Sequence, residues 1–78
     1  MPNLSKEACD ARLAFKQACQ WCYQNVGSII QYEAAATLRL EAYERMRDLG
    51  ALGTTWNHSH EKQFREDLLQ VWKALGRY

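Results

Sequence analysis

The cysteines Cys19 and Cys22 form a C-x-x-C motif, a spacing used by thiol redox sites and by zinc sites. A redox pair of this form normally begins a helix that follows a strand, where the helix dipole lowers the thiol pKa. Here the apolar periodicity places the pair deep inside a helix with no strand before it. We therefore expect two free thiols that belong to the core.

Zinc binding would need further ligands, and the sequence offers His58 and His60. Paired histidine ligands are usually separated by about three to five residues, whereas one residue separates these two. Cys19 and Cys22 also map onto the apolar stripe of their helix. We therefore expect no metal or other cofactor. The alternative is a zinc site formed by Cys19, Cys22, His58 and His60. His60 is expected at the edge of the apolar face of the third helix.

Arg39 is the polar residue with the strongest indication of a specific role. On a helical wheel it lies within an apolar arc, with Tyr32 and Tyr43 on the same side. Because an unpaired buried guanidinium is costly, Arg39 needs a partner. We expect a structural ion pair with Asp10, Asp67 or a carboxylate of a second copy. The alternative is an anion site, in which Arg39 meets a phosphate or a target carboxylate with both tyrosines beside it.

The elements that position these residues are helices. The first is predicted from about Ser5 to Val26, followed by Gly27 in a left-handed conformation and by Ser28, which begins an S-x-x-Q capping box. These signals predict a tight turn, and the alternative is one continuous helix of more than about forty residues. The apolar stripe of the first helix consists of Ala8, Ala11, Phe15, Ala18 and Cys22, extended by Leu4, Val26 and Ile29.

The second helix is predicted from about Ile29 to Leu49, with Gly50 as its stop signal. It is apolar around more than half of its circumference, which indicates neighbours on both flanks. A loop over residues 50–58 leads to a third helix that Asn57 or Ser59 caps. Glu61 and Arg65 are expected to pair on the solvated side of that helix. Its apolar stripe consists of Phe64, Leu68, Val71, Trp72 and Leu75.

Residues 1–78 are thus predicted to form a single all-α domain, a small three-helix bundle. Two long antiparallel helices are joined by a tight turn at Gly27-Ser28, and the loop over residues 50–58 precedes the third helix. A chain of 78 residues that lacks a disulfide framework is marginally stable, which favours a homodimer or higher oligomer. Three cysteines without an apparent export signal indicate a cytoplasmic protein, and no apolar run approaches the length of a membrane span.

Trp21 and Leu13 are predicted to point away from the bundle, where they would form a second contact surface. The alternative for Trp21 is packing against the third helix. Trp56 is a further aromatic residue expected at a binding surface. The candidate binding residues are Leu13, Trp21, Tyr32, Arg39, Tyr43, Trp56 and His60.

The function expected from these features is that of a non-enzymatic protein-interaction module, an adaptor or a stoichiometric inhibitor of a protein partner. No P-loop, G-x-G-x-x-G or H-E-x-x-H motif is present. The alternative is a binder of a small anionic ligand such as a nucleotide at an oligomer interface. A nucleic-acid-binding regulator is a weaker alternative, because the net charge is only +1. In size, neutrality and helix content, the chain is similar to small phage-encoded proteins that block host or defence machinery.

Overall fold

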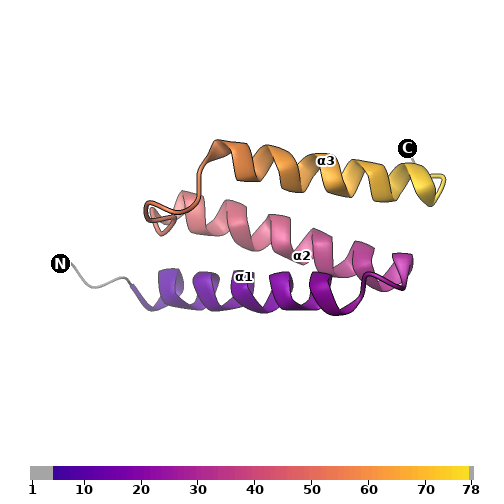
Figure 1. The fold of residues 1–78 in the computed structure, drawn as a ribbon. Coiled ribbons are helices and arrows are strands. Elements are labelled where there is room, and N and C mark those ends of the chain that lie inside the picture. The colour runs from indigo at the N-terminus through magenta and orange to yellow at the C-terminus, as the bar shows by residue number, and fades with distance from the viewer. Residues whose placement is uncertain (1–4, 78) are drawn as a thin grey trace.

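Over its described residues, the protein is an all-α structure of three helices. The computed structural model describes residues 5–77 and places α1 at Lys6–Gln24, α2 at Ile29–Asp48 and α3 at His58–Ala74. Successive helices run in opposite directions, with α2 between α1 and α3 (Figure 1). Within residues 5–77 the backbones of α1 and α3 do not pack directly on each other. The prediction that the second helix has neighbours on both flanks is therefore confirmed.

The turn between α1 and α2 confirms the antiparallel hairpin and excludes the continuous helix, but its chemistry differs from the prediction. Asn25 is the C-cap of α1, and Gly27 does not adopt a left-handed conformation. Ser28 precedes α2 without a side-chain capping hydrogen bond, so the predicted capping box does not form. By contrast, Ser5 caps α1 by accepting a hydrogen bond from the amide of Ala8 at 3.1 Å.

The buried face of α1 is the predicted stripe, since its buried residues are Ala8, Ala11, Phe15, Ala18 and Cys22. The predicted extension of this stripe is wrong for Val26 and Ile29, which are exposed. Because α1 ends before Val26, the helical period that placed these side chains inside no longer applies there. Leu4 lies outside the described residues.

An aromatic cluster joins all three helices at the end of the molecule that holds the α2–α3 loop. The ring of Phe15 on α1 lies 5.8 Å from Phe64 on α3 and 4.9 Å from Trp56 in the loop, measured between centroids. Tyr43 on α2 completes the cluster at 5.7 Å from Phe15. These edge-to-face and tilted contacts connect α1 to α3 through side chains, because the helix backbones themselves stay apart.

Complementary charges hold α3 in register against α2. Among the described residues, four ion pairs link α2 to α3 and to Arg77 just after it: Arg47–Glu61, Glu44–Arg65, Arg39–Asp67 and Glu33–Arg77. The prediction that Glu61 lies on the solvated side of α3 is wrong, because its side chain is buried and accepts a hydrogen bond from Arg47. Arg65 is still near, at 3.9 Å, but the principal partner of Glu61 is on the neighbouring helix.

Candidate interaction surfaces

Arg39 lies at the centre of the contact between α2 and α3, and its partner is Asp67. One guanidinium nitrogen, Nη2, donates to Asp67 Oδ2 at 2.7 Å, and the hydroxyl of Tyr32 donates to the same oxygen at 2.5 Å. The guanidinium carbon also lies 4.5 Å from the centroid of the Phe64 ring. The arginine side chain is 13% exposed. Of the predicted partners, the structure thus selects Asp67.

This network keeps Arg39 charged in a largely apolar setting. Burial by itself lowers the pKa of Arg39, but Cys22, the hydrogen bond to Asp67 and Tyr32 more than offset that effect, so the pKa ends above its ordinary value. Burial and the Asp67 carboxylate both raise the pKa of Tyr32. Asp67 therefore occupies one nitrogen of the guanidinium, while the buried Nε of Arg39 has no hydrogen-bond partner among the described residues. Because the carboxylate that pairs with Arg39 comes from within the chain, this geometry gives no support to the phosphate-site alternative.

Three other predicted site residues belong to the aromatic cluster. Tyr43 does not accompany Tyr32 beside the ion pair, since it is fully buried and its hydroxyl donates to the Asn57 backbone carbonyl. Trp56 is half-buried against Phe15, and the imidazole of His60 lies 4.8 Å from the Trp56 ring. His60 Nδ1 also accepts a hydrogen bond from the backbone amide of Asn57, which completes a capping box at the start of α3.

Cys19 and Cys22 are free thiols, as predicted. Cys22 is buried and Cys19 is half-buried, and burial raises the pKa of both thiols, opposite to the shift that activates a redox cysteine. Among the described residues, no three His, Cys, Asp or Glu side chains gather as metal ligands. The zinc alternative with His58 and His60 therefore finds no support in that part of the chain.

Large apolar side chains are exposed around the α1–α2 hairpin. Trp21 is 44% exposed, and the alternative in which it packs against α3 is wrong, since it lines hollows formed by α1 and α2. Leu38 on α2 lies across from it and is 45% exposed. We define the hairpin surface as the exposed apolar residues of this region: Trp21, Tyr23, Val26, Ile29, Ile30 and Leu38.

A shallow groove between α1 and α2 runs beneath Trp21 and Leu38. It comprises two adjoining hollows of about 320 and 350 Å³. The described residues that line this hairpin groove come from α1, α2 and the turn: Ala11, Ala14, Gln17, Trp21, Asn25, Gln31, Ala34, Ala35, Leu38, Glu41, Ala42 and Arg45. Leu13 is exposed, as predicted, but does not line this groove. The small residues allow another helix to approach closely.

Sequence reasoning missed the four residues at the end of the hairpin: Tyr23, Val26, Ile29 and Ile30. Tyr23 is 85% exposed, and the other three are exposed as well. A signal was present, because residues 17–32 contain no Asp, Glu, Lys or Arg. A helical hairpin whose connecting turn carries large apolar residues and no charge is typical of a contact surface rather than a solvated end.

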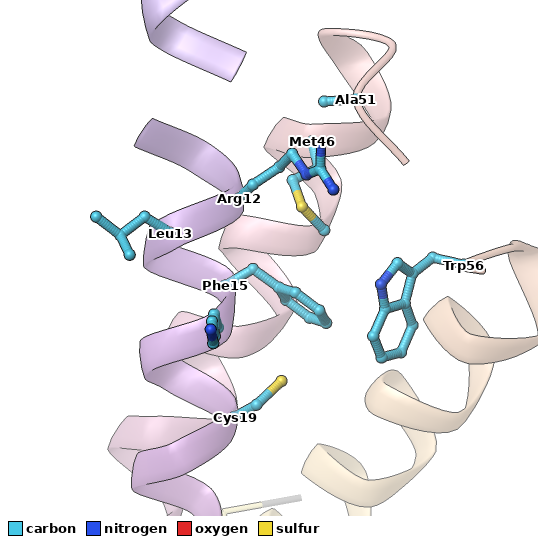
Figure 2. Close-up of a pocket in the computed structure, with 8 residues that line it drawn as sticks. Arg12, Leu13, Phe15, Cys19, Met46, Ala51 and Trp56 are labelled. Atoms are coloured by element: carbon cyan, nitrogen blue, oxygen red, sulfur yellow. The ribbon is translucent and has the colours of Figure 1, made fainter. Parts of the chain in front are cut away.

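A separate pocket lies on the side of α1 that faces Trp56. It has a volume of about 500 Å³ and is lined by Arg12, Leu13, Phe15, Lys16, Cys19, Met46, Ala51 and Trp56. Figure 2 shows Arg12, Phe15 and Cys19 directed from α1 toward the side on which Trp56 lies, whereas Leu13 points away. We call this hollow the Trp56 pocket. It does not include Arg39 or Tyr32.

Comparison of this chain with models of protein families, with curated proteins and with solved structures finds no significant match. No helix within residues 5–77 is both long and apolar enough to cross a membrane. The surfaces described above are therefore the basis for a functional assignment.

Proposed function

We propose that this chain is a non-enzymatic protein-interaction module, an adaptor or a stoichiometric inhibitor, that contacts protein through the hairpin surface. The observation that supports the proposal is the exposure of large apolar side chains on an uncharged segment. Among residues 5–77, eight such side chains are exposed, and five of them lie within residues 17–32. Trp and Tyr contribute disproportionately to binding energy at protein interfaces.

We infer that a second copy of the chain occupies the hairpin groove. Glu41 and Arg45 line it one helical turn apart, and in the described part of the chain neither takes part in an ion pair. In a twofold pairing of antiparallel α2 helices, Glu41 of each copy faces Arg45 of the other. Trp21 and Leu38 then pack over the alanines of the opposite chain. The surface is thus complementary to itself in charge and in shape.

The mass of the protein in solution, measured by light scattering over about 1 µM to 1 mM, tests this proposal. The wild-type chain should show a concentration-dependent dimer or higher oligomer. Trp21→Ala and Leu38→Ala should each weaken association at least about tenfold, which corresponds to about 1.4 kcal/mol. Leu69→Ala is the matched control, because Leu69 is an exposed leucine on α3 outside the groove. It should leave association unchanged.

Exchanging the charges of Glu41 and Arg45 tests whether a second copy of the chain occupies the hairpin groove. Glu41→Arg should weaken association, since it places two positive charges opposite each other across the twofold axis. The double variant Glu41→Arg/Arg45→Glu should restore it, because the opposite pairing is re-formed. A protein that keeps the mass of one chain throughout the concentration range would contradict self-association. Equal losses from Trp21→Ala and Leu69→Ala would show that the hairpin surface is not the contact.

A further inference from the structure

We propose that the Trp56 pocket binds a small amphipathic carboxylate, a molecule with an apolar chain or ring and one anionic end group. The proposal is independent of the hairpin surface, because the two sites share none of their described lining residues. It rests on the size of the pocket, on its apolar walls and on the two cations that line it, Arg12 (Figure 2) and Lys16.

The walls of the pocket are formed by buried core residues and by a ring that packs against them. Phe15 and Met46 belong to the buried core, and Trp56 packs edge-to-face on Phe15 with centroids 4.9 Å apart. Ala51 follows the turn after α2, where Gly50 adopts a φ of +69°. A preformed apolar wall favours an apolar ligand because binding does not first have to order the side chains.

Arg12 and Lys16 give the pocket its charge. They lie one turn apart on α1 and are the charged groups among the described residues that line it. Both are exposed, and no carboxylate between residues 5 and 77 forms an ion pair with either of them. An anionic group next to the apolar walls would therefore meet two cations that have no internal partner. The planar fork of Arg12 suits a carboxylate in particular.

The size and polarity of the pocket narrow the class of ligand. A volume of about 500 Å³ lies within the range of roughly 300–1,000 Å³ that is usual for small-molecule sites. At about 30 Å³ for each water-sized group, a chain of about ten carbons with one carboxylate fits. A nucleotide fits poorly, because its base and sugar need hydrogen-bond partners that the walls formed by Phe15, Met46 and Trp56 do not supply.

Calorimetric titration with decanoate, below the concentration at which it forms micelles, tests the proposal. We expect saturable binding of one decanoate per chain, and a loss of affinity of about tenfold or more for 1-decanol, which lacks the charge. Arg12→Gln/Lys16→Gln should reduce decanoate affinity to a similar extent. The matched control is Lys6→Gln/Lys62→Gln, which removes the same charge from two exposed lysines that do not line the pocket and should bind normally.

A second readout locates the ligand. Cys19 lines the pocket, so bound decanoate should slow its alkylation by iodoacetamide without changing the rate at the exposed Cys9. Absence of saturable binding to the folded protein would overturn the proposal. Equal weakening by the two double variants would overturn it too. If an acidic amphipathic peptide protects Cys19 and decanoate does not, the ligand of the pocket is a protein segment and the proposal of a small molecule is wrong.

Discussion

Arg39 on α2 and Asp67 on α3 form a 2.7 Å ion pair beneath which the Phe64 ring lies, so one contact combines charge, a hydrogen bond and an aromatic face. Asp67→Ala should destabilise the protein by about 2–3 kcal/mol, because it leaves the guanidinium largely buried without its carboxylate. For a domain of this size the melting temperature should fall by about 10–20 °C. Thermal unfolding followed by circular dichroism measures this loss.

The double variant Arg39→Met/Asp67→Ala tests whether these two residues stabilise the protein through their interaction with each other. Methionine keeps an apolar chain over Phe64 and removes the charge that would otherwise remain buried. We expect the double variant to be more stable than Asp67→Ala alone. A double variant whose loss equals the sum of the losses of Arg39→Met and Asp67→Ala would mean that the two residues are not energetically coupled.

The sequence predicts the fold well wherever the information is local. The apolar stripe of α1 follows from the helical period, and its five predicted members between Ala8 and Cys22 are all buried. The partner of Arg39 cannot be predicted from local periodicity, because identifying Asp67 requires the register of α3 against α2. That register depends on interhelix pairs such as Arg47–Glu61, which no helical wheel of a single helix reveals.

The candidate surfaces are predictable only in part, for a related reason. The exposure of Trp21 follows from its angle relative to the stripe of α1, and the structure agrees. The helical wheel misplaces Val26 and Ile29, because α1 ends at Gln24 and its period does not continue beyond that residue. The Trp56 pocket depends on a loop that brings Trp56 against α1, and the conformation of that loop has no periodic signal.

Substitution by alanine should change the free energy of unfolding in opposite directions at two glycines near helix ends. Gly50 has a φ of +69°, which alanine adopts at a cost, so Gly50→Ala should lose about 1 kcal/mol. Gly27 lies outside the left-handed region, and a Cβ there would meet no described atom within 4 Å. Gly27→Ala should therefore be neutral or stabilise by about 0.4–1 kcal/mol. Urea unfolding of both variants compares them, and a larger loss at Gly27 would contradict this account of the turn.

The start of α3 depends on the side chain of Asn57. Its carboxamide oxygen accepts a hydrogen bond from the amide of Ser59 at 2.9 Å, so Asn57→Ala should cost about 1 kcal/mol of unfolding free energy. Asn57→Asp is the control, because it keeps an acceptor in place and adds a favourable charge near the helix N-terminus. Tyr43 bonds the backbone carbonyl of residue 57 and is unaffected by either change. Equal stability of the two variants would show that the cap contributes nothing measurable.

Stability should fall at alkaline pH because four acidic protons are held more tightly in the folded protein than in the unfolded chain. Burial raises the pKa of Cys19, Cys22, Tyr32 and Tyr43. The unfolded chain loses these protons first, from about pH 8.5 for thiols and about pH 10 for phenols. Above those values the folded state binds more protons than the unfolded state, so the free energy of unfolding decreases as pH rises.

Melting temperatures recorded from about pH 7 to 11 under reducing conditions test this expectation. In the double variant Cys19→Ala/Cys22→Ala, the melting temperature should begin to fall at a higher pH, near that at which phenols ionise. Adding Tyr32→Phe should then reduce the remaining decrease of the melting temperature with pH. Cys9→Ala removes an exposed thiol and is the matched control. A wild-type melting temperature that stays constant up to pH 11 would mean that these protons are bound equally in both states. The stability of the folded protein would then not depend on the ionisation of these thiols and phenols.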